Sequence, residues 1–265
     1  MIADLSGRVA FITGAGSGIG RATAVCLAEQ GATVEATDLD DEALHSLIGE
    51  LSVQRAHATR VDVTVPAEVR LAVDEAAARH GRLDILVCSA GIVFADDAER
   101  RVDPAADWDR CMAVNLRGTV NACEAAIDHL RQRTDGAIVT IGSISAHASR
   151  ATLGAYPVSK AAVLRYTKSL ALALAPAIRV NAVCPGAVWT GMQARIAAEI
   201  RRLTGAADRD NDEKTFFARY EAITPMKRPQ TPQDVAKAAA FLASPDAANI
   251  TGQCLHVDGG AVIRD

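Results

Sequence analysis

The sequence predicts a doubly wound α/β domain, in which one parallel sheet carries helices on both of its faces. Short runs rich in β-branched and apolar residues alternate along the chain with longer stretches of helical periodicity. The short runs are apolar almost throughout, which is typical of parallel strands buried on both faces. We expect seven such strands, at residues 8–13, 33–37, 58–63, 83–90, 137–143, 178–185 and 253–258.

Helices are expected between these strands, because parallel strands need a crossover connection. Their candidate ranges are 20–31, 40–51, 66–81, 104–133, 155–175 and 231–244. No linker rich in proline, glycine or serine divides the chain, so residues 1–265 are interpreted as one domain. Residues 189–230 are the one long interruption, and we expect a helical lid there, since ligands of such sheets bind beyond the carboxyl ends of the strands.

The bulk composition indicates a globular protein and argues against a nucleic-acid partner. Apolar residues make up 49% of the chain, charged residues make up 23%, and the formal net charge is −4. This is not the basic excess of a nucleic-acid binder. The longest uncharged runs are too short to span a bilayer, and the first residues do not resemble a cleavable leader. We therefore expect a cytoplasmic protein without membrane contact.

Cysteine spacing indicates free thiols and no bound metal. None of the cysteines forms a CxxC pair, and most lie inside apolar runs, where a small core residue is expected. The six are Cys26, Cys88, Cys111, Cys123, Cys184 and Cys254.

A glycine-rich turn follows the first expected strand directly. In TGAGSGIG, residues 13–20, glycines alternate before a helix. Glycine lets the backbone approach a pyrophosphate closely, and the helix N-terminus supplies unpaired N–H donors and partial positive charge. The spacing differs from GxGxxG because position 19 is Ile19. The alternative is a tight connection without a ligand.

Asp38, at the end of the second expected strand, is a candidate ribose ligand. A carboxylate in this position accepts hydrogen bonds from the ribose hydroxyls and repels a 2′-phosphate. The alternative is that Asp38 caps the next helix, although Asp40 or Asp41 could do so equally well. Position 17 is Ser17, so no cation is present there to attract a 2′-phosphate. The pattern favours NAD over NADP.

Tyr156 and Lys160 are four residues apart at the head of an expected helix and therefore share a face. A free phenol titrates near pH ~10. An ammonium group ~4 Å away, at an effective dielectric constant of ~20, favours the phenolate by about 4 kcal/mol. The pair can thus provide a general acid/base with a lowered tyrosine pKa. The alternative is an aromatic ring packed on a lysine stem.

Two further polar residues are candidates for the same site. Ser143 lies at the carboxyl end of the fifth expected strand, where its hydroxyl can donate to a substrate oxygen, and Ser145 is an alternative donor. Asn115 interrupts an apolar helical face, where it could hold a water molecule beside Lys160. The alternatives are a serine that caps a turn and a hydrogen-bonded core asparagine.

Six motifs in sequence order resemble the short-chain dehydrogenase/reductase family over essentially the whole chain. They are TGAGSGIG, VDVT at 61–64, CSAG at 88–91, VNLRG at 114–118, the Ser143/Tyr156/Lys160 set and PGAVWT at 185–190. The resemblance implies a single Rossmann-type domain, a nicotinamide cofactor and a homotetramer.

The resemblance also implies roles for individual residues. Asn115, Ser143, Tyr156 and Lys160 would be catalytic. Cofactor-binding residues would be Gly14, Ser17, Gly18, Ile19 and Asp38 at the adenosine diphosphate, Asp62 and Val63 at the adenine, Ala90 and Gly91 alongside, Tyr156 and Lys160 at the nicotinamide ribose, and Pro185, Gly186, Val188 and Thr190 near the carboxamide.

Two positions depart from the family pattern. The usual NNAG is CSAG here, so Cys88 and Ser89 replace two asparagines. Ser89 can still hydrogen-bond neighbouring backbone, with a shorter reach. Pro157 stands inside the YxxxK motif, and proline suits a first helical turn but not a helix interior. Tyr156 is therefore expected within about one turn of a helix start, or at a kink.

Candidate substrate-pocket residues are fewer and less specific. Trp189 follows the last motif, and we also expect Phe94, Ser145 and His147 near the substrate, with His147 as a surface or supporting polar residue. The alternative is that the lid aromatics only pack the lid onto the body. Arg195, together with the arginines at 201 and 202, has the spacing of a solvated helix face, which argues against an anionic substrate.

The combined hypothesis is an NAD-dependent oxidoreductase that interconverts a secondary alcohol and its ketone. A polyol, an acetoin-type diol or a cyclic alcohol is the expected substrate class. The alternatives are a nucleotide-sensing or scaffold protein on the same fold and an epimerase or dehydratase that keeps NAD bound. A non-enzyme would be expected to lose the catalytic set, whereas this chain retains it.

Overall fold

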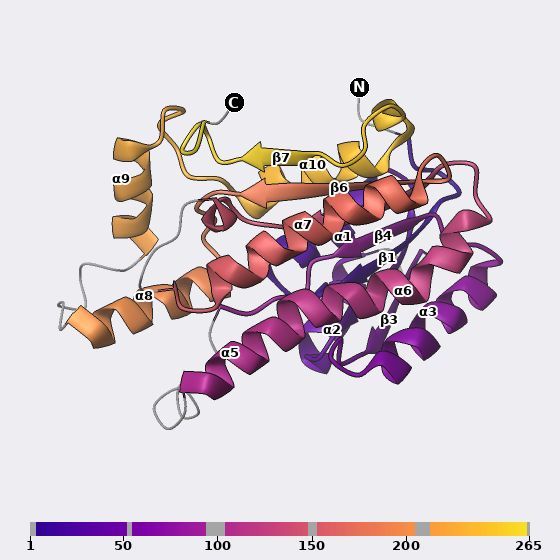
Figure 1. The fold of residues 1–265 in the computed structure, drawn as a ribbon, viewed down its shortest axis with the longest axis horizontal. Helices are drawn as coiled ribbons and strands as arrows, with labels where there is room; N and C mark the ends of the chain where they lie inside the picture. Colours follow the sequence, from indigo (N-terminus) through magenta and orange to yellow (C-terminus); the bar gives the residue numbers. More distant parts are fainter. Residues whose placement is uncertain (1–3, 52–54, 94–103, 148–152, 205–212, 264–265) are drawn as a thin grey trace.

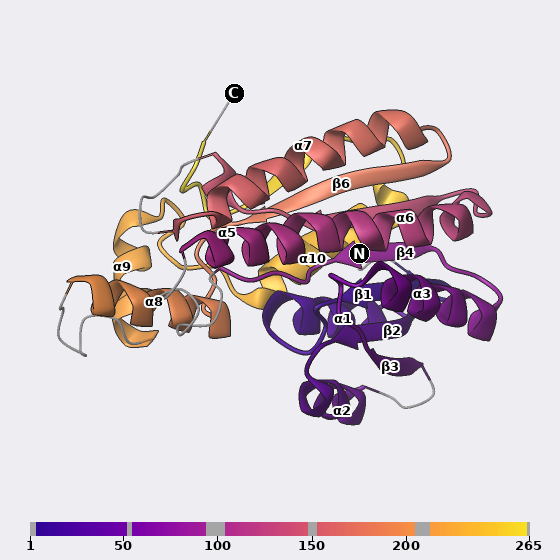
Figure 2. The same ribbon diagram turned by 60° about the horizontal axis from the view of Figure 1, so that its bottom comes forward.

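A sheet of seven parallel strands forms the centre of the computed structural model (Figures 1 and 2). The structure describes residues 4–51, 55–93, 104–147, 153–204 and 213–263. The strand order is β3-β2-β1-β4-β5-β6-β7. The strands are β1 (Val9–Thr13), β2 (Thr33–Asp38), β3 (Ala56–Arg60), β4 (Ile85–Cys88), β5 (Gly136–Ile141), β6 (Ile178–Pro185) and β7 (Cys254–Val257).

The expected strands are all present, and their observed ends lie within three residues of the expected ones. Helices connect them as the crossover rule requires. They are α1 (Gly18–Glu29), α2 (Asp41–Glu50), α3 (Pro66–His80), α5 (Pro104–Met112), α6 (Gly118–Arg131), α7 (Tyr156–Leu174), α8 (Gly191–Thr204), α9 (Glu213–Ile223) and α10 (Pro232–Ala243). No helix in the described part of the chain is both long enough and apolar enough to cross a bilayer.

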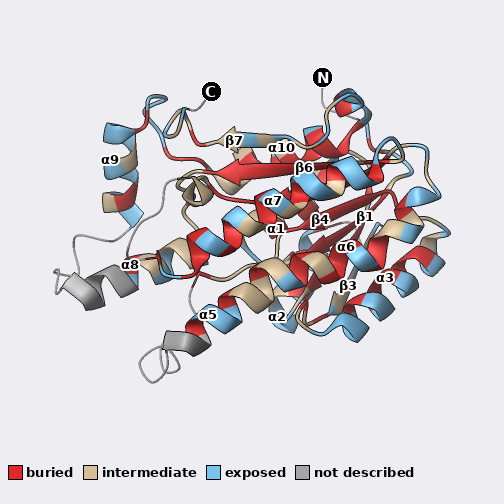
Figure 3. Ribbon diagram, in the orientation of Figure 1, coloured by how far each residue is buried: buried red, intermediate tan, exposed pale blue. Residues whose placement is uncertain are grey.

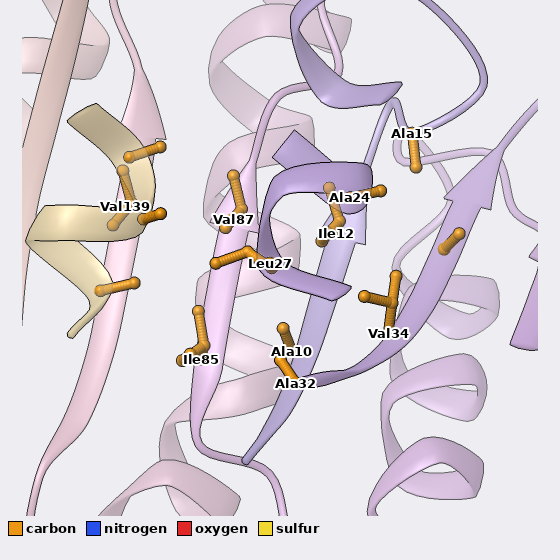
Figure 4. Close-up of a cluster of buried hydrophobic side chains, with 14 of the residues drawn as sticks. Ala10, Ile12, Ala15, Ala24, Leu27, Ala32, Val34, Ile85, Val87 and Val139 are labelled. Carbon is orange, nitrogen blue, oxygen red and sulfur yellow. The ribbon is translucent and has the colours of Figure 1, made fainter. Parts of the chain in front are cut away.

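Two apolar layers hold the helices to the sheet, one on each face. Alternate strand residues such as Ile12 and Val87 pack against α1, α2 and α10 (Figure 4). Their neighbours in the strands, such as Phe11 and Leu86, point to the other face and pack against α3, α6 and α7. The strands are therefore buried on both sides, as their continuous apolar sequences predict, and Figure 3 shows the buried centre between half-exposed helices.

Local sequence signals define several helix ends. Asp40 accepts a hydrogen bond from the Ala43 N–H at 3.0 Å and so caps α2. Thr231 and Asp234 form a reciprocal capping box at the start of α10. Asp38, at the end of β2, is not the cap of α2, which leaves its carboxylate at the sheet edge.

The long helical range expected at 104–133 consists of two α-helices joined by a π-helical turn, Ala113–Arg117. Its apolar periodicity continues through the turn, so the sequence pattern alone did not indicate it. The turn contains Asn115, which is buried. Single π-turns inside helices are frequent at functional sites because they re-aim side chains.

β1 and β4 are neighbours at the centre of the sheet, and the chain leaves them toward opposite sides. At such a reversal the loops that follow the two strands separate and leave a crevice at the carboxyl edge. α8 and α9, from the range expected to form a lid, lie beyond this edge (Figures 1 and 2). The fold therefore places the turns after β1 and β4 and the two helices α8 and α9 around one opening.

Candidate active site

A cavity of about 640 Å³ lies beyond the carboxyl ends of the central strands. Its lining includes residues that follow β1, β2, β4, β5 and β6, together with residues of α5, α8 and α9. This volume lies in the range of small-molecule and cofactor sites. The structure thus brings residues from distant parts of the sequence to one cleft.

The turn between β1 and α1 forms one end of this cavity, here called the nucleotide end, and its backbone lies very close to neighbouring backbone. Gly14 has φ of +68°, and a Cβ there would approach the backbone of Ala90 to 2.6 Å. A Cβ on Gly20 would lie 1.9 Å from the Gly14 carbonyl oxygen. These glycines allow the N-terminus of α1 to reach the cavity beside Ser17 and Gly18. The helix terminus directs N–H groups to the place where a pyrophosphate would lie.

Asp38 lies beside this turn. Its Oδ2 accepts a hydrogen bond from the Gly16 N–H at 2.9 Å, and its Oδ1 accepts one from the Asp40 N–H at 3.1 Å. Each carboxylate oxygen retains a lone pair for a further donor, as a ribose hydroxyl would require. Asp62 and Val63 line the same end, and Asp62 Oδ1 accepts hydrogen bonds from the Thr64 N–H and hydroxyl.

The CSAG turn after β4 is held by its backbone. Thr13 Oγ1 accepts hydrogen bonds from the N–H groups of Ser89 and Ala90, at 3.2 and 3.3 Å. Cys88 is buried, and its Sγ lies 3.9 Å from Cys123 Sγ. The turn is therefore anchored through a threonine of the neighbouring strand, where the sequence analysis considered only the Ser89 side chain. Ala90 and Gly91 line the cavity.

Ser143, Tyr156 and Lys160 come together in the middle of the cavity. Ser143 lies two residues after the end of β5, in extended conformation, and Tyr156 is the first residue of α7. The Tyr156 hydroxyl forms a hydrogen bond with the Ser143 side chain. Pro157 occupies the first turn of α7, as expected from its missing N–H.

Lys160 reaches the same point from one turn further along α7. Its Nζ donates to the Ile141 carbonyl oxygen at 2.8 Å and lies 5.8 Å from the centre of the Tyr156 ring. A Cβ on Gly91 would approach Lys160 Nζ to 3.4 Å. Gly91 thus lies directly beside the ammonium group.

The pKa values of the pair differ from the expectation based on spacing. Burial raises the pKa of Tyr156 to about 12, although its hydrogen bond with Ser143 acts in the opposite direction. Burial lowers the pKa of Lys160 to about 8. The expected lowering of the Tyr156 pKa by Lys160 is thus wrong for the isolated chain, because desolvation outweighs a cation that is itself partly neutralised.

Asn115 supports this arrangement from the π-turn. Its side-chain Oδ1 accepts from the Ile92 N–H at 2.8 Å, while Nδ2 donates to the Ile92 carbonyl and to Ser159 Oγ, both at 2.9 Å. The side chain thereby joins the β4 loop to α7. Asn115 Oδ1 would also be 3.3 Å from a Cβ on Gly91. The asparagine lies behind the cavity lining, next to the lysine end.

The carboxyl end of β6 supplies the next wall. Pro185, Gly186, Val188 and Thr190 all line the cavity, and the Thr190 side chain lies next to Gly18. A Cβ on Gly186 would meet Gln230 Oε1 at 2.4 Å. This packing brings the loop after β6 against the glycine turn after β1.

The four residues predicted to contact the substrate do not all line the cavity. Trp189 and Ser145 line the cavity, and the Trp189 ring packs against Phe216 with ring centres 5.0 Å apart. His147 does not belong to the lining; its ring lies against His256 instead. Phe94 lies outside the described residues.

Sequence reasoning missed two cationic residues at the cavity. Arg110 of α5 and Arg219 of α9 line it together with Arg195 of α8. None of the three forms an ion pair with another residue that the structure describes. Among the described residues of the lining, the acidic ones are Asp38 and Asp62, at the nucleotide end. No local motif marks Arg110 or Arg219, because only the tertiary fold brings their helices to the opening.

Comparison with known proteins agrees with this geometry. A family model described as enoyl-(acyl carrier protein) reductase matches residues 14–262. The chain is 37% identical to 2,3-dihydro-2,3-dihydroxybenzoate dehydrogenase of Bacillus subtilis (strain 168), over 98% of this chain and 97% of the relative. It is 38% identical to cis-4-hydroxycyclohexanecarboxylate dehydrogenase of Sinomonas cyclohexanicum, over 96% of each.

A solved structure is similar over its whole length. It is the short-chain dehydrogenase/reductase described as glucose/ribitol dehydrogenase from Brucella melitensis, with a TM-score of 0.86, 33% identity and full coverage of both chains. The match extends from the glycine turn through the Ser143, Tyr156 and Lys160 region to the last strand. The chain belongs to the short-chain dehydrogenase/reductase family, and it is an oxidoreductase of that family.

Proposed function

We propose that the protein is an NAD-dependent dehydrogenase that interconverts a secondary alcohol and its ketone. The observation that carries this proposal is the meeting of the Ser143 and Tyr156 hydroxyl groups in one cavity with Lys160. Relatives named as dehydrogenases of a dihydrodiol and of a cyclic alcohol support the same reaction type.

The protein residues divide the proton chemistry among them. Ser143 would hydrogen-bond the substrate oxygen and hold it beside the Tyr156 hydroxyl. Tyr156 would take the alcohol proton during oxidation and return it during reduction. Lys160, with a pKa of about 8, can exchange protons near neutral pH from within reach of Tyr156. A bound nicotinamide would supply the hydride acceptor or donor, and its positive charge in the oxidised form would favour the phenolate.

Cofactor binding would use the glycine turn and Asp38. The turn provides backbone N–H groups at the start of α1, and the Asp38 carboxylate lies at the ribose position. A 2′-phosphate beside this carboxylate would meet like charge, and Arg21, which contacts the same turn at the Gly16 carbonyl, is already paired with Glu50 at 2.8 Å. NAD is therefore the proposed cofactor, and NADP a poorer one.

We further propose that the alcohol carries an anionic group. Among the described lining residues, those near Arg110, Arg195 and Arg219 include no acid, and no described residue forms an ion pair with these arginines. Arginine binds carboxylates through paired hydrogen bonds. The names of two relatives, a benzoate and a cyclohexanecarboxylate dehydrogenase, also indicate carboxylate substrates for those proteins. This replaces the expectation that Arg195 belongs only to a solvated helix face.

The test is a matched set of alcohols with NAD and, separately, with NADP. Cyclohexanol, 4-hydroxycyclohexanecarboxylate, acetoin and ribitol would each be mixed with the protein while NADH absorbance is followed. We expect NADH formation, fastest with the carboxylate. NADH formation that is faster with the neutral alcohols would reject the anionic group and leave the dehydrogenase. Bound nicotinamide without net NADH from any alcohol would favour the sensor, epimerase or dehydratase alternatives.

Single arginine variants sharpen the substrate test. R195Q and R219Q should each lower kcat/KM for the carboxylate about tenfold, because a charge-assisted hydrogen bond is lost, and should leave kcat/KM for cyclohexanol unchanged. The matched control is R165Q, since Arg165 is an exposed arginine of α7 that does not line the cavity. Equal losses for the charged and the neutral alcohol would contradict a carboxylate contact.

A further inference from the structure

Three side chains with metal-ligating atoms meet under the edge of the sheet, outside the cavity lining. They are His147, Cys184 and His256, and their ligand atoms all lie within 4.8 Å of one another. The sequence analysis expected no metal because no two cysteines have a local ligand spacing. The fold brings the three residues together from separate parts of the chain.

β6 and β7 position two members of this cluster. Cys184 and His256 are register partners in the parallel pair of these strands. Cys184 is fully buried, in a small apolar group with Ala182 and with Leu164 of α7. His147 follows the short 3₁₀ turn Ile144–Ala146, which begins directly after Ser143. Because these backbone elements are hydrogen-bonded or packed against the sheet, the cluster is held by the fold and not by flexible loops.

The two imidazole rings are arranged for a shared ligand. Their centres are 5.1 Å apart with an interplanar angle of 66°, so the rings meet edge to face. His256 Nε2 is buried and has no hydrogen-bond partner among the described residues. A buried imidazole nitrogen without a partner costs free energy unless a further group satisfies it.

A second thiol lies next to the cluster. Cys254 stands two residues before His256 in β7, and its thiol interacts with Cys184. Cys254 also packs against the apolar group that contains Cys184, so a second sulfur atom lies at the site. Thiolate is the form of cysteine that binds metal.

We propose that His147, Cys184 and His256 bind one Zn²⁺ ion, with Cys254 completing the coordination. Two imidazole nitrogens and thiolate sulfur are the donor set of four-coordinate zinc sites. Zinc with bonds of about 2.0–2.3 Å places its ligand atoms about 3.5 Å apart. The ligand atoms of His147, Cys184 and His256, within 4.8 Å of one another, therefore need to move inward only slightly. Binding would release the thiol protons of Cys184 and Cys254 to solvent as the two zinc–sulfur bonds form.

This zinc ion would be structural, because none of its three core ligands lines the substrate cavity. Its site is nevertheless coupled to the catalytic serine. The Ser143 backbone N–H donates a hydrogen bond to Cys184 Sγ. The ion would therefore tie the segment from Ser143 to His147 to β6 and β7 and restrict its motion.

Titration with Co²⁺ tests the site without relying on activity. Tag-free, chelator-treated protein would be kept reduced and titrated with CoCl₂ while the near-ultraviolet and visible spectrum is recorded. We expect one Co²⁺ per chain, a thiolate-to-cobalt charge-transfer band, tetrahedral d–d bands and displacement of Co²⁺ by Zn²⁺. Zn²⁺ should also raise the Tm of the wild-type protein.

Two ligand variants and two matched controls distinguish this site from adventitious binding. C184S and H256Q should each weaken Zn²⁺ binding at least about tenfold, since even supporting residues of metal sites have effects of this size. C184S should weaken the charge-transfer band, and the double variant C184S/C254S should remove it. H129Q and C26S should change neither, because His129 pairs with Asp74 on the surface and Cys26 lies on α1. Circular dichroism of the metal-free variants would verify folding, and H256Q serves if C184S does not fold.

Several results would overturn the proposal. Saturation without a sulfur band, a band that survives in C184S/C254S, or equal Zn²⁺ affinity in H256Q and H129Q would each mean that the metal binds elsewhere. A wild-type protein whose Tm does not respond to Zn²⁺ would show that the ion does not stabilise the folded chain.

Discussion

The two ends of the cavity are constructed in different ways. At the nucleotide end, backbone atoms form the surface, and glycines are needed because a side chain would collide with a neighbouring strand or turn. At the substrate end, side chains of α5, α8 and α9 form the surface, and several of them are exposed. A surface made of backbone atoms has a fixed shape and fits one shape of ligand. Exposed side chains, by contrast, can be substituted during evolution without loss of the fold. We therefore propose that the first end selects the cofactor and the second end selects the substrate.

The largest expected effect lies between the two ends, at Tyr156. Y156F should lower kcat about a thousandfold, because loss of a positioned general acid/base costs about 10²–10⁴ in rate. NADH binding, measured by fluorescence, should remain. The control is Y166F, a tyrosine of the same helix that packs toward α6 and away from the cavity. Turnover of Y156F within a few-fold of wild type would refute the proposed role.

The next effect tests whether charge at the nucleotide end selects the cofactor. D38N keeps an acceptor for the Gly16 N–H but removes the negative charge, so the ratio of kcat/KM for NAD to that for NADP should fall at least about tenfold, as relief of a like-charge contact predicts. D40A is the control. It removes the cap of α2 and should cost about 1 kcal/mol of stability without altering the ratio. An unchanged ratio in D38N would assign cofactor choice to other groups.

A comparison of two glycines can separate the need for space at the nucleotide end from the need for a positive φ. Gly14 and Gly81 have nearly equal positive φ values, +68° and +66°, but only Gly14 has neighbouring atoms in the way of a Cβ. G81A should cost about 1–2 kcal/mol of unfolding free energy from strain alone. G14A should cost about 1–3 kcal/mol more, from the collision with Ala90, and weaken NAD binding. Urea denaturation measures the difference, and equal losses would argue against the close approach.

The smallest effect is the pH dependence that buried Lys160 gives to stability. Its pKa is about 8 in the folded chain, against the ordinary lysine value of 10.5. Between these values the unfolded chain binds more protons, so the free energy of unfolding should rise with pH in this window. Tyr156, with its pKa raised from 10.0 to about 12, acts oppositely, and its contribution is lost as pH rises through that range.

K160M should flatten the rise between about pH 8 and 10, whereas K214M, at an exposed lysine of α9, should retain it. Urea denaturation at several pH values in this window measures both slopes. Identical slopes in wild type and K160M would mean that the Lys160 pKa is not lowered by burial.

Prediction from sequence succeeded where the pattern is local. The seven strands follow from short apolar runs, and Tyr156 was placed at a helix start because Pro157 follows it. The π-turn at Ala113–Arg117 was missed because one additional residue per turn does not interrupt an apolar stripe. These outcomes show that apolar periodicity can locate a helix but cannot distinguish an α-helical turn from a π-helical turn.

Prediction failed where properties depend on surroundings. The pKa of Tyr156 was judged from its spacing to Lys160, yet both groups are buried, and desolvation dominates both values. Arg110 and Arg219 reach the cavity only through packing of their helices. The cluster of His147, Cys184 and His256 has no sequence spacing at all, since β6 and β7 meet through the sheet order.

The π-turn also bears on how this chain could acquire new substrates. In an α-helix each residue advances the chain by about 100° around the axis, so deleting one residue from Ala113–Arg117 would restore regular winding and rotate α5 relative to α6. α6 packs into the buried layer on the sheet, whereas α5 carries Arg110 to the cavity. A change of one residue in chain length would thus rotate α5 and move Arg110 relative to the substrate end of the cavity, whereas the nucleotide end would keep its position.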